Sequence, residues 1–189
     1  MKHAASYRHP PLKRHASLQP LSRDHYVGLV QAQHLQRAAD GHAGQRRAAL
    51  ADFCSAWETD IAGHFADEET LLPPLMEPEA RDRLVREHAL LRALAAEPRA
   101  RLAWADPASD WMRRLSETLR DHIRWEERLA FPAIEQADPV MLKILEEQTQ
   151  IIERTRPRIH GNRQPMAEFG FRKMPRPVRS RAPGALDQP

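Results

Sequence analysis

A chain of 189 residues with 41% hydrophobic residues suits one domain with tails. Its single cysteine, Cys54, excludes a disulfide framework and a thiolate metal cage, and it fits a reducing compartment. Because no apolar run approaches the length of a membrane span and no signal-peptide pattern opens the chain, the sequence predicts a cytoplasmic protein without a membrane partner.

The charge is unevenly distributed, although the net charge is only +3. Of 29 Lys and Arg residues, four lie in residues 1–20 and nine in residues 154–189, and these segments hold only two of the 26 acidic residues. Residues 21–153 therefore carry 16 basic and 24 acidic side chains. The pI near 9.4 describes the tails, so we expect no nucleic-acid partner beyond weak contact with a basic tail.

Apolar residues recur at helical spacing in four long segments and one short one, and no segment alternates as a strand does. Residues 1–20 hold three prolines and lack this periodicity, so they predict a flexible N-terminal arm. Ser22 is the expected N-cap of the first helix, which ends at Asp40-Gly41. The other helices are predicted at about 45–72, at 79–97 before Pro98, from Pro107 onward, and in a short segment that Asp138-Pro139 opens.

The helical pattern ends near residue 153. Residues 154–189 contain six prolines, three glycines and an excess of arginine, which predicts a disordered basic tail. Four long amphipathic helices with short connections predict an all-α fold over residues 21–153, an up-down-up-down four-helix bundle with a short fifth helix and flexible basic tails.

Two stretches, which begin at His64 and His122, share the pattern His-x-x-x-Glu-Glu-x-Leu-x-x-Pro. Residues four apart share one helix face, so each stretch directs an imidazole and a carboxylate to the same side, and the prolines should end both helices. His25 and His88 lie singly in the apolar stripes of the other two helices. Buried groups of this kind are costly without partners, and a metal ion accepts both imidazole and carboxylate. The predicted metal ligands are His25, His64, Glu68, His88, His122 and Glu126.

Four nitrogen donors and two carboxylates suit two iron-sized ions, each with two histidines, while Glu68 and Glu126 lie between the ions. Without a sulfur ligand, iron–sulfur chemistry is not expected. Zinc is an alternative, but six donors suit two ions better than one. The other alternative is four structural histidines bonded to carbonyls, which is the commoner role for one histidine but not for four on successive helices.

In their order, His25, His64-x-x-x-Glu68, His88 and His122-x-x-x-Glu126 resemble the hemerythrin-like, HHE cation-binding domain over roughly residues 20–153. The resemblance implies a non-haem di-iron centre inside a four-helix bundle, with these six residues as ligands and a small diatomic partner such as oxygen or nitric oxide. Related domains bind oxygen, respond to nitric oxide, help restore damaged iron centres, or sense iron and oxygen.

Two positions depart from the oxygen carriers of that family. Those carriers have a fifth histidine where this chain has Arg92, and their last carboxylate falls where this chain has Glu127, which is therefore an alternative to Glu126. Arg92 lies one turn after His88 on the same helix face, so we expect it to approach the metal pair and stabilise an anionic ligand. Because arginine cannot ligate a metal, we also expect one iron to keep an open or water-filled position. The pairing of Arg92 with an acid such as Glu87 or Asp121 is the alternative.

Two functions are compatible with these residues. The first is a protein that binds or senses a small ligand, or handles iron, with little or no turnover. The second is a di-iron enzyme that reduces oxygen, peroxide or nitric oxide, including a role in iron-centre repair under nitrosative stress. Turnover requires an electron donor, and the sequence carries no flavin-binding or reductase signature, which favours the first.

Overall fold

The computed structural model describes residues 13–101 and 107–155, without the side chains of residues 98–101. Helices and no strands form in these residues, which confirms the predicted all-α class. In chain order the elements are α1 (Gln19–Ala39), α2 (Ala43–Ala56), the π-helix η1 (Trp57–Ile61), α3 (Ala62–Leu71), the 3-10 helix η2 (Pro73–Leu75), α4 (Pro78–Arg101), α5 (Ser109–Trp125), the π-helix η3 (Glu126–Ala130), α6 (Phe131–Ile134) and α7 (Pro139–Thr155).

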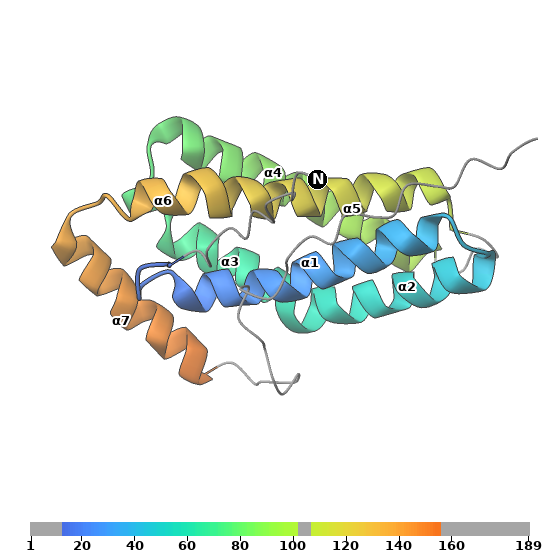
Figure 1. Ribbon diagram of the computed structural model, residues 1–189, viewed down its shortest axis with the longest axis horizontal. Coiled ribbons are helices and arrows are strands. Elements are labelled where there is room, and N and C mark those ends of the chain that lie inside the picture. Colours follow the sequence, from blue (N-terminus) through green and yellow to red (C-terminus); the bar gives the residue numbers. More distant parts are fainter. Residues whose placement is uncertain (1–12, 102–106, 156–189) are drawn as a thin grey trace, which may run out of the picture.

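The described helices form a bundle of long rods that lie side by side (Figure 1). The rods are α1, then α2 continued by η1 and α3, then α4, and finally α5 continued by η3 and α6. α7 lies across one end of the bundle and contacts α1. It was predicted as a short helix but has 17 residues, as many as α5. Thr149 Oγ1 in α7 donates to the carbonyl of Ser17 at 3.0 Å, which ties this helix to the segment before α1.

Several helix boundaries differ from the predicted ones. α1 begins at Gln19, so Ser22 lies inside the helix and not at its N-cap, because Pro20 fits a first turn, in which its missing N–H loses no bond. α4 continues past Pro98 to Arg101, since a proline so close to a helix end removes only one of the last backbone bonds. α5 begins at Ser109, after Pro107.

Two of the rods contain a π-helical turn that was not predicted. η1 precedes His64, and η3 begins at Glu126. Because a π turn closes its hydrogen bonds five residues apart, it changes which residues face the core. In η3 both Glu126 and Glu127 are buried, although neighbours in a regular α-helix lie 100° apart. This rod also continues past Pro132, which was expected to end it.

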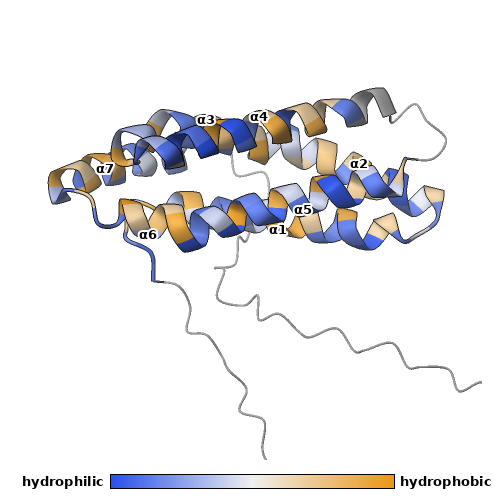
Figure 2. Ribbon diagram, turned by 90° about the horizontal axis from the view of Figure 1, so that it is seen from above, coloured by the Kyte–Doolittle hydropathy of each residue, from blue (hydrophilic) through white to orange (hydrophobic). Residues whose placement is uncertain are grey.

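The core consists of two apolar clusters with a polar layer between them. One cluster includes Phe53 and Leu91, and the other includes Leu84 and Trp125. His88 lies in sequence between Leu84 and Leu91, so α4 contributes to both clusters and to the layer between them. Hydrophobic and hydrophilic residues share each helix, as the sequence predicted (Figure 2). Among the described residues, no helix is both long and apolar enough to cross a lipid bilayer.

Packing against the bundle starts before the predicted domain boundary at residue 21. Ser17 and Leu18 are fully buried, and Arg14 contacts the bundle through a side chain that is only 5% exposed. Part of the predicted flexible arm is therefore structural. Of the predicted basic tail, only Arg154 and Thr155 are described, and they belong to α7; residues 156–189 lie outside the described residues.

Candidate metal centre

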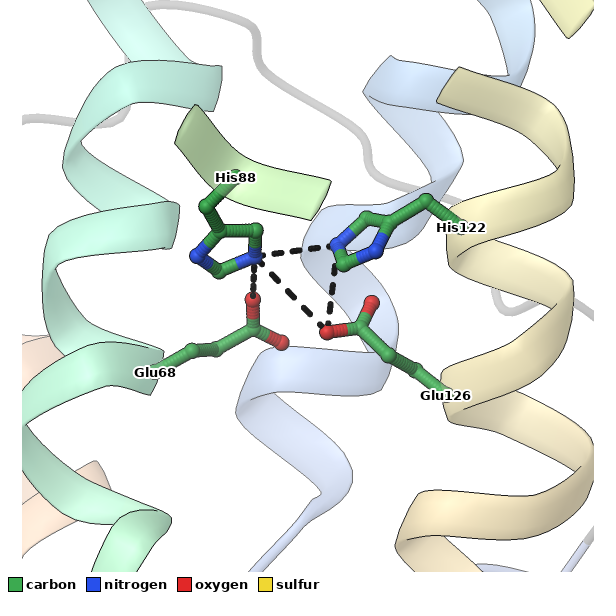
Figure 3. Close-up of side chains that lie close together, drawn as sticks. All are labelled: Glu68, His88, His122 and Glu126. Carbon is green, nitrogen blue, oxygen red and sulfur yellow. Dashed lines mark hydrogen bonds and ion pairs between the residues drawn. The ribbon is translucent and has the colours of Figure 1, made fainter. Parts of the chain in front are cut away.

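The six predicted ligands lie together in the polar layer, and each is at most 4% exposed. Their donor atoms fall into two overlapping groups, and within each group the atoms lie within 4.8 Å of one another. Figure 3 shows four side chains from α3, α4, α5 and η3 converging on one point. The groups are Glu68, His88, His122 and Glu126, and His25, His64 and Glu68.

The carboxylate of Glu68 lies between the two pairs of histidines. Its Oε1 is 3.4 Å from His25 Nε2 and 3.1 Å from His64 Nε2. Its Oε2 is 3.5 Å from His88 Nε2, a contact drawn in Figure 3. One oxygen therefore faces each pair.

Glu126 has the same relation to the two pairs. Its Oε1 is 3.3 Å from His122 Nε2 and 3.9 Å from His88 Nε2, and its Oε2 is 3.1 Å from His25 Nε2. Both carboxylates thus reach across the layer, from the His25 side to the His88 side. Of the two candidates left open by the sequence, Glu126 lies among the Nε2 atoms, whereas Glu127 lies on the far side of His25.

Most of these inward-facing atoms have no hydrogen-bond partner, which is costly in a buried site. Around an octahedral ion with bonds of about 2.1 Å, neighbouring donor atoms lie about 3.0 Å apart. The separations of 2.9 to 3.9 Å observed here suit donors that share an ion. The residues therefore fit a metal. The atoms without a partner include His25 Nε2, His64 Nε2 and both carboxylate oxygens of Glu68 and Glu126.

The second ring nitrogen, Nδ1, of each histidine faces a carboxylate. Such a contact orients the ring and leaves Nε2 available to a metal. None of these carboxylates was predicted to take part in the centre from the sequence, apart from Glu127 as an alternative ligand. The hydrogen-bonded pairs are His25 with Glu127 at 2.7 Å, His88 with Glu69 at 2.9 Å and His122 with Glu87 at 2.9 Å, while His64 Nδ1 is 3.7 Å from Asp24.

The glutamate doublet of each repeated motif accounts for two of these contacts. The first glutamate joins the centre, and the second supports a lone histidine on another helix. Glu69 supports His88 in this way, and Glu127 supports His25. The doublet was visible in the sequence, and its repetition was the signal for the second role.

The remaining two contacts are made by the acidic residue that directly precedes each lone histidine in the sequence. Glu87 precedes His88 and bonds His122. Asp24 precedes His25 and faces His64 at 3.7 Å. An acid–histidine pair on one helix and a His-x-x-x-Glu-Glu motif on another thus occur twice, and the two halves of the site are related by an approximate two-fold relation.

Arg92 does not approach the centre, contrary to the prediction. Its Nη1 and Nη2 donate to Glu69 Oε1 and Oε2 at 2.7 and 2.9 Å. The partner is thus neither Glu87 nor Asp121. Because Glu69 already bonds the ring of His88, one turn before Arg92 on α4, its carboxylate lies within direct reach of the guanidinium.

The electrostatics of the cluster favour charged side chains. Burial lowers the pKa of His25, but the adjacent carboxylates of Glu126 and Glu127 outweigh it and raise the pKa well above its ordinary value. Burial also opposes the charge of His122, yet Glu126 raises the pKa of His122 to about 9. Despite burial, the neighbouring histidines hold the pKa of Glu68 well below its usual range. Without a metal, protons on His25 and His122 help to balance the carboxylates, and a bound cation would replace those protons.

A small cavity adjoins the His25–His64 pair. Its volume is about 10 Å³, which is close to the space that one water molecule requires. His25, His64 and Gly28 line it, together with Ile123 from α5. Both ring nitrogens of His64 lack a hydrogen bond. The cavity therefore belongs to this half of the site, since neither His88 nor His122 lines it.

The comparison with known families agrees with this geometry. The hemerythrin HHE cation binding domain matches residues 21–134 and residues 80–163, a span that holds all six predicted ligands. No curated protein and no solved structure matches the chain. The chain belongs to the hemerythrin HHE cation-binding domain family, and its buried histidine–glutamate cluster is a site that could bind metal cations.

Proposed function

We propose that the protein holds two iron ions in a non-haem centre between the two apolar clusters. His25 and His64 would hold one ion, and His88 and His122 the other. Glu68 and Glu126 would bridge them. The observation that carries this proposal is that each of these buried carboxylates directs one oxygen to each histidine pair while lacking a hydrogen bond.

The chemistry of the donors supports iron. Imidazole and carboxylate suit iron in mixed nitrogen and oxygen sites, and no sulfur belongs to the cluster. The carboxylates at Nδ1 would raise the donor strength of the rings and hold their orientation. When bound, a pair of iron ions supplies one-electron redox chemistry and open positions for a small ligand.

The two halves of the site favour a ligand of diatomic size on one side. His25 and His64 line the cavity, whereas His88 and His122 do not. A space of about 10 Å³ is too small for an organic substrate but suits a molecule such as oxygen or nitric oxide. We therefore propose that the protein binds or senses such a ligand.

Aromatic rings would keep bulk water from the histidines. Phe65 stacks on His88 with ring centroids 3.9 Å apart, and Phe131 stacks on His25 at 5.3 Å. Both phenylalanines are essentially fully buried. A dry site strengthens the interaction of its carboxylates with a cation.

Metal analysis of the protein purified from iron-rich medium tests the proposal. We expect about two iron ions per chain. A chain with one ion or none would contradict a two-iron centre. Mixing the reduced, iron-loaded protein with excess nitric oxide and a reductant then separates the functions. Uptake that stops at a fixed ratio to protein supports binding or sensing, whereas continuous consumption supports the enzyme.

A further inference from the structure

Three of the carboxylates that contact a histidine Nδ1 also pair with an arginine, and one of these arginines differs from the others. Arg83 and Arg92 lie at the surface, and each has a side chain that is 40% exposed. Arg14 is only 5% exposed. The pairs are Glu87 with Arg83 at 2.7 Å, Glu69 with Arg92 at 2.7 Å and Glu127 with Arg14 at 2.8 Å.

The two-fold relation between the halves explains why Arg14 is needed. In one half, Arg92 lies four residues after His88 and pairs with the glutamate that supports this histidine. The equivalent position, four residues after His25, is Leu29, which carries no charge. Helix α1 therefore offers no such cation to Glu127, and the segment before α1 supplies one.

Arg14 binds Glu127 through both the side chain and the backbone. Its Nε and Nη2 donate to Glu127 Oε2 at 3.0 and 2.8 Å, and Nη2 also donates to the backbone carbonyl of Glu127. In a π turn that carbonyl would accept from the N–H five residues later, but that residue is Pro132, which has none. Arg14 thus satisfies an acceptor that the proline leaves open.

The guanidinium also reaches the other support of His25. It lies 5.7 Å from the ring centroid of Phe131, which stacks on the imidazole of His25. The backbone N–H of the next residue, His15, donates to Glu135 Oε1 at 2.9 Å and holds the segment in place. Arg14 therefore contacts both groups that orient His25.

We propose that Arg14 is a positioning residue of the metal centre, which holds Glu127 and Phe131 so that His25 keeps its orientation toward the His25–His64 ion. This inference rests on the proposed two-iron centre. A charge pair buried from solvent is screened far less than one at the surface. The loss of Arg14 should therefore disturb the centre more than the loss of Arg83 or Arg92.

The experiment compares full-length variants loaded with iron(II). Arg14→Gln removes the buried charge, and Arg14→Lys keeps the charge but not the planar fork. Arg92→Gln removes the equivalent arginine from the exposed pair. Arg23→Gln is a surface control, since Arg23 pairs with Glu153 at 2.7 Å, outside the cluster. The number of bound ions is measured first, and then the rate at which each ion is lost to an excess of chelator.

We expect Arg14→Gln to release one of its two ions at least about tenfold faster than the native chain, as is typical when the hydrogen-bonded support of a metal ligand is removed. The other ion should leave at the native rate. In Arg14→Lys, the release rate of the faster ion should lie between its rates in the native chain and in Arg14→Gln. Arg92→Gln should change the release rates less than Arg14→Gln does. Arg23→Gln should match the native chain. If the native chain binds two ions and Arg14→Gln releases both at the native rates, the proposed role of Arg14 is overturned while the proposed two-iron centre stands.

A purely structural role for Arg14 predicts other outcomes. Both ions would then leave faster by the same factor, and Arg14→Lys would be as impaired as Arg14→Gln. The exchange rate of the His25 Nδ1 proton, followed by NMR in the cobalt(II)-loaded protein, gives a second readout. This exchange rate should rise in both Arg14 variants, including any variant that still holds both ions. An exchange rate equal to that of the native chain in both Arg14→Lys and Arg14→Gln would also overturn the proposal. A native chain that binds no metal would remove this inference together with the proposed function.

Discussion

Replacing Gly28 with alanine should close the cavity next to His25 and His64 without touching a metal ligand. A Cβ atom at Gly28 would lie 2.7 Å from Ile123 Cδ1 and 3.8 Å from Leu119 Cδ1. The first contact is too close, so the end of the Ile123 side chain must move. All three residues line the same cavity of about 10 Å³, so the added methyl group and the displaced Ile123 would fill it.

Gly63 provides the matched control, because it also lies inside a helix and a Cβ there would meet nothing within 4 Å. Gly63→Ala should stabilise the fold by about 1 kcal/mol through helix propensity alone. Gly28→Ala receives the same gain, but the displacement of Ile123 should offset much of it. Urea unfolding of both variants measures this difference.

The informative assay is the association rate of nitric oxide with the reduced, iron-loaded protein, measured by stopped-flow absorbance. We expect Gly28→Ala to slow association at least about tenfold, which corresponds to a barrier increase of about 1.4 kcal/mol. Gly63→Ala should keep the native rate, and both variants should keep two iron ions. A native association rate in fully loaded Gly28→Ala would refute the proposal that a small ligand of the centre occupies this cavity.

Further predictions concern the ligands, the pH and the tail. His64→Ala should bind less iron than the native chain by metal analysis, and its metal-loaded form should unfold at lower temperature, because the remaining buried donors lose their shared partner. In the metal-free protein, the pKa of His122 is raised from 6.5 to about 9, so its charge stabilises the fold fully below pH 6.5 and this contribution is lost as the pH rises through about 9. Urea unfolding should therefore show a loss between pH 6.5 and pH 10 that is smaller in His122→Gln. A chain that ends at Thr155 should keep both iron ions by metal analysis, since no predicted ligand lies beyond that residue; a truncated chain that cannot hold iron would contradict this.

The inward-facing residues could be found from the sequence because their signal is local. A histidine and a glutamate four residues apart, such as His122 and Glu126, share one helix face whatever the rest of the fold does. The apolar stripe that surrounds them shows that this face is buried. The close approach of the six predicted residues is what this reasoning implied, and their binding of iron stays a prediction.

Features that depend on contacts between helices could not be predicted in the same way. Arg92 lies on the face of its helix that the spacing indicated, but a nearby carboxylate on another helix, Glu69, determines where its guanidinium points. Arg14 belongs to a segment without periodicity, and its partner Glu127 is 113 residues away. The length of a helical segment likewise does not predict a π turn, because the turn depends on how the buried face of that helix is aligned with the neighbouring helices.

The π turn of η1 makes the centre sensitive to chain length as well as to chemistry. The turn accommodates one residue more than a regular α-helical turn, so deleting a single residue from Trp57–Ile61, such as the exposed Thr59, would let the rod continue as a regular α-helix with His64 and Glu68 still aligned with Leu50 and Phe53. Adding a residue has the opposite effect, because in a helical continuation the part after the insertion would turn by about 100° relative to the part before it. Either His64 and Glu68 would then leave the centre, or Leu50 and Phe53 would leave the core. An in-frame gain of one codon would thus abolish the centre while every ligand is still encoded, whereas the loss of one codon in this turn would not.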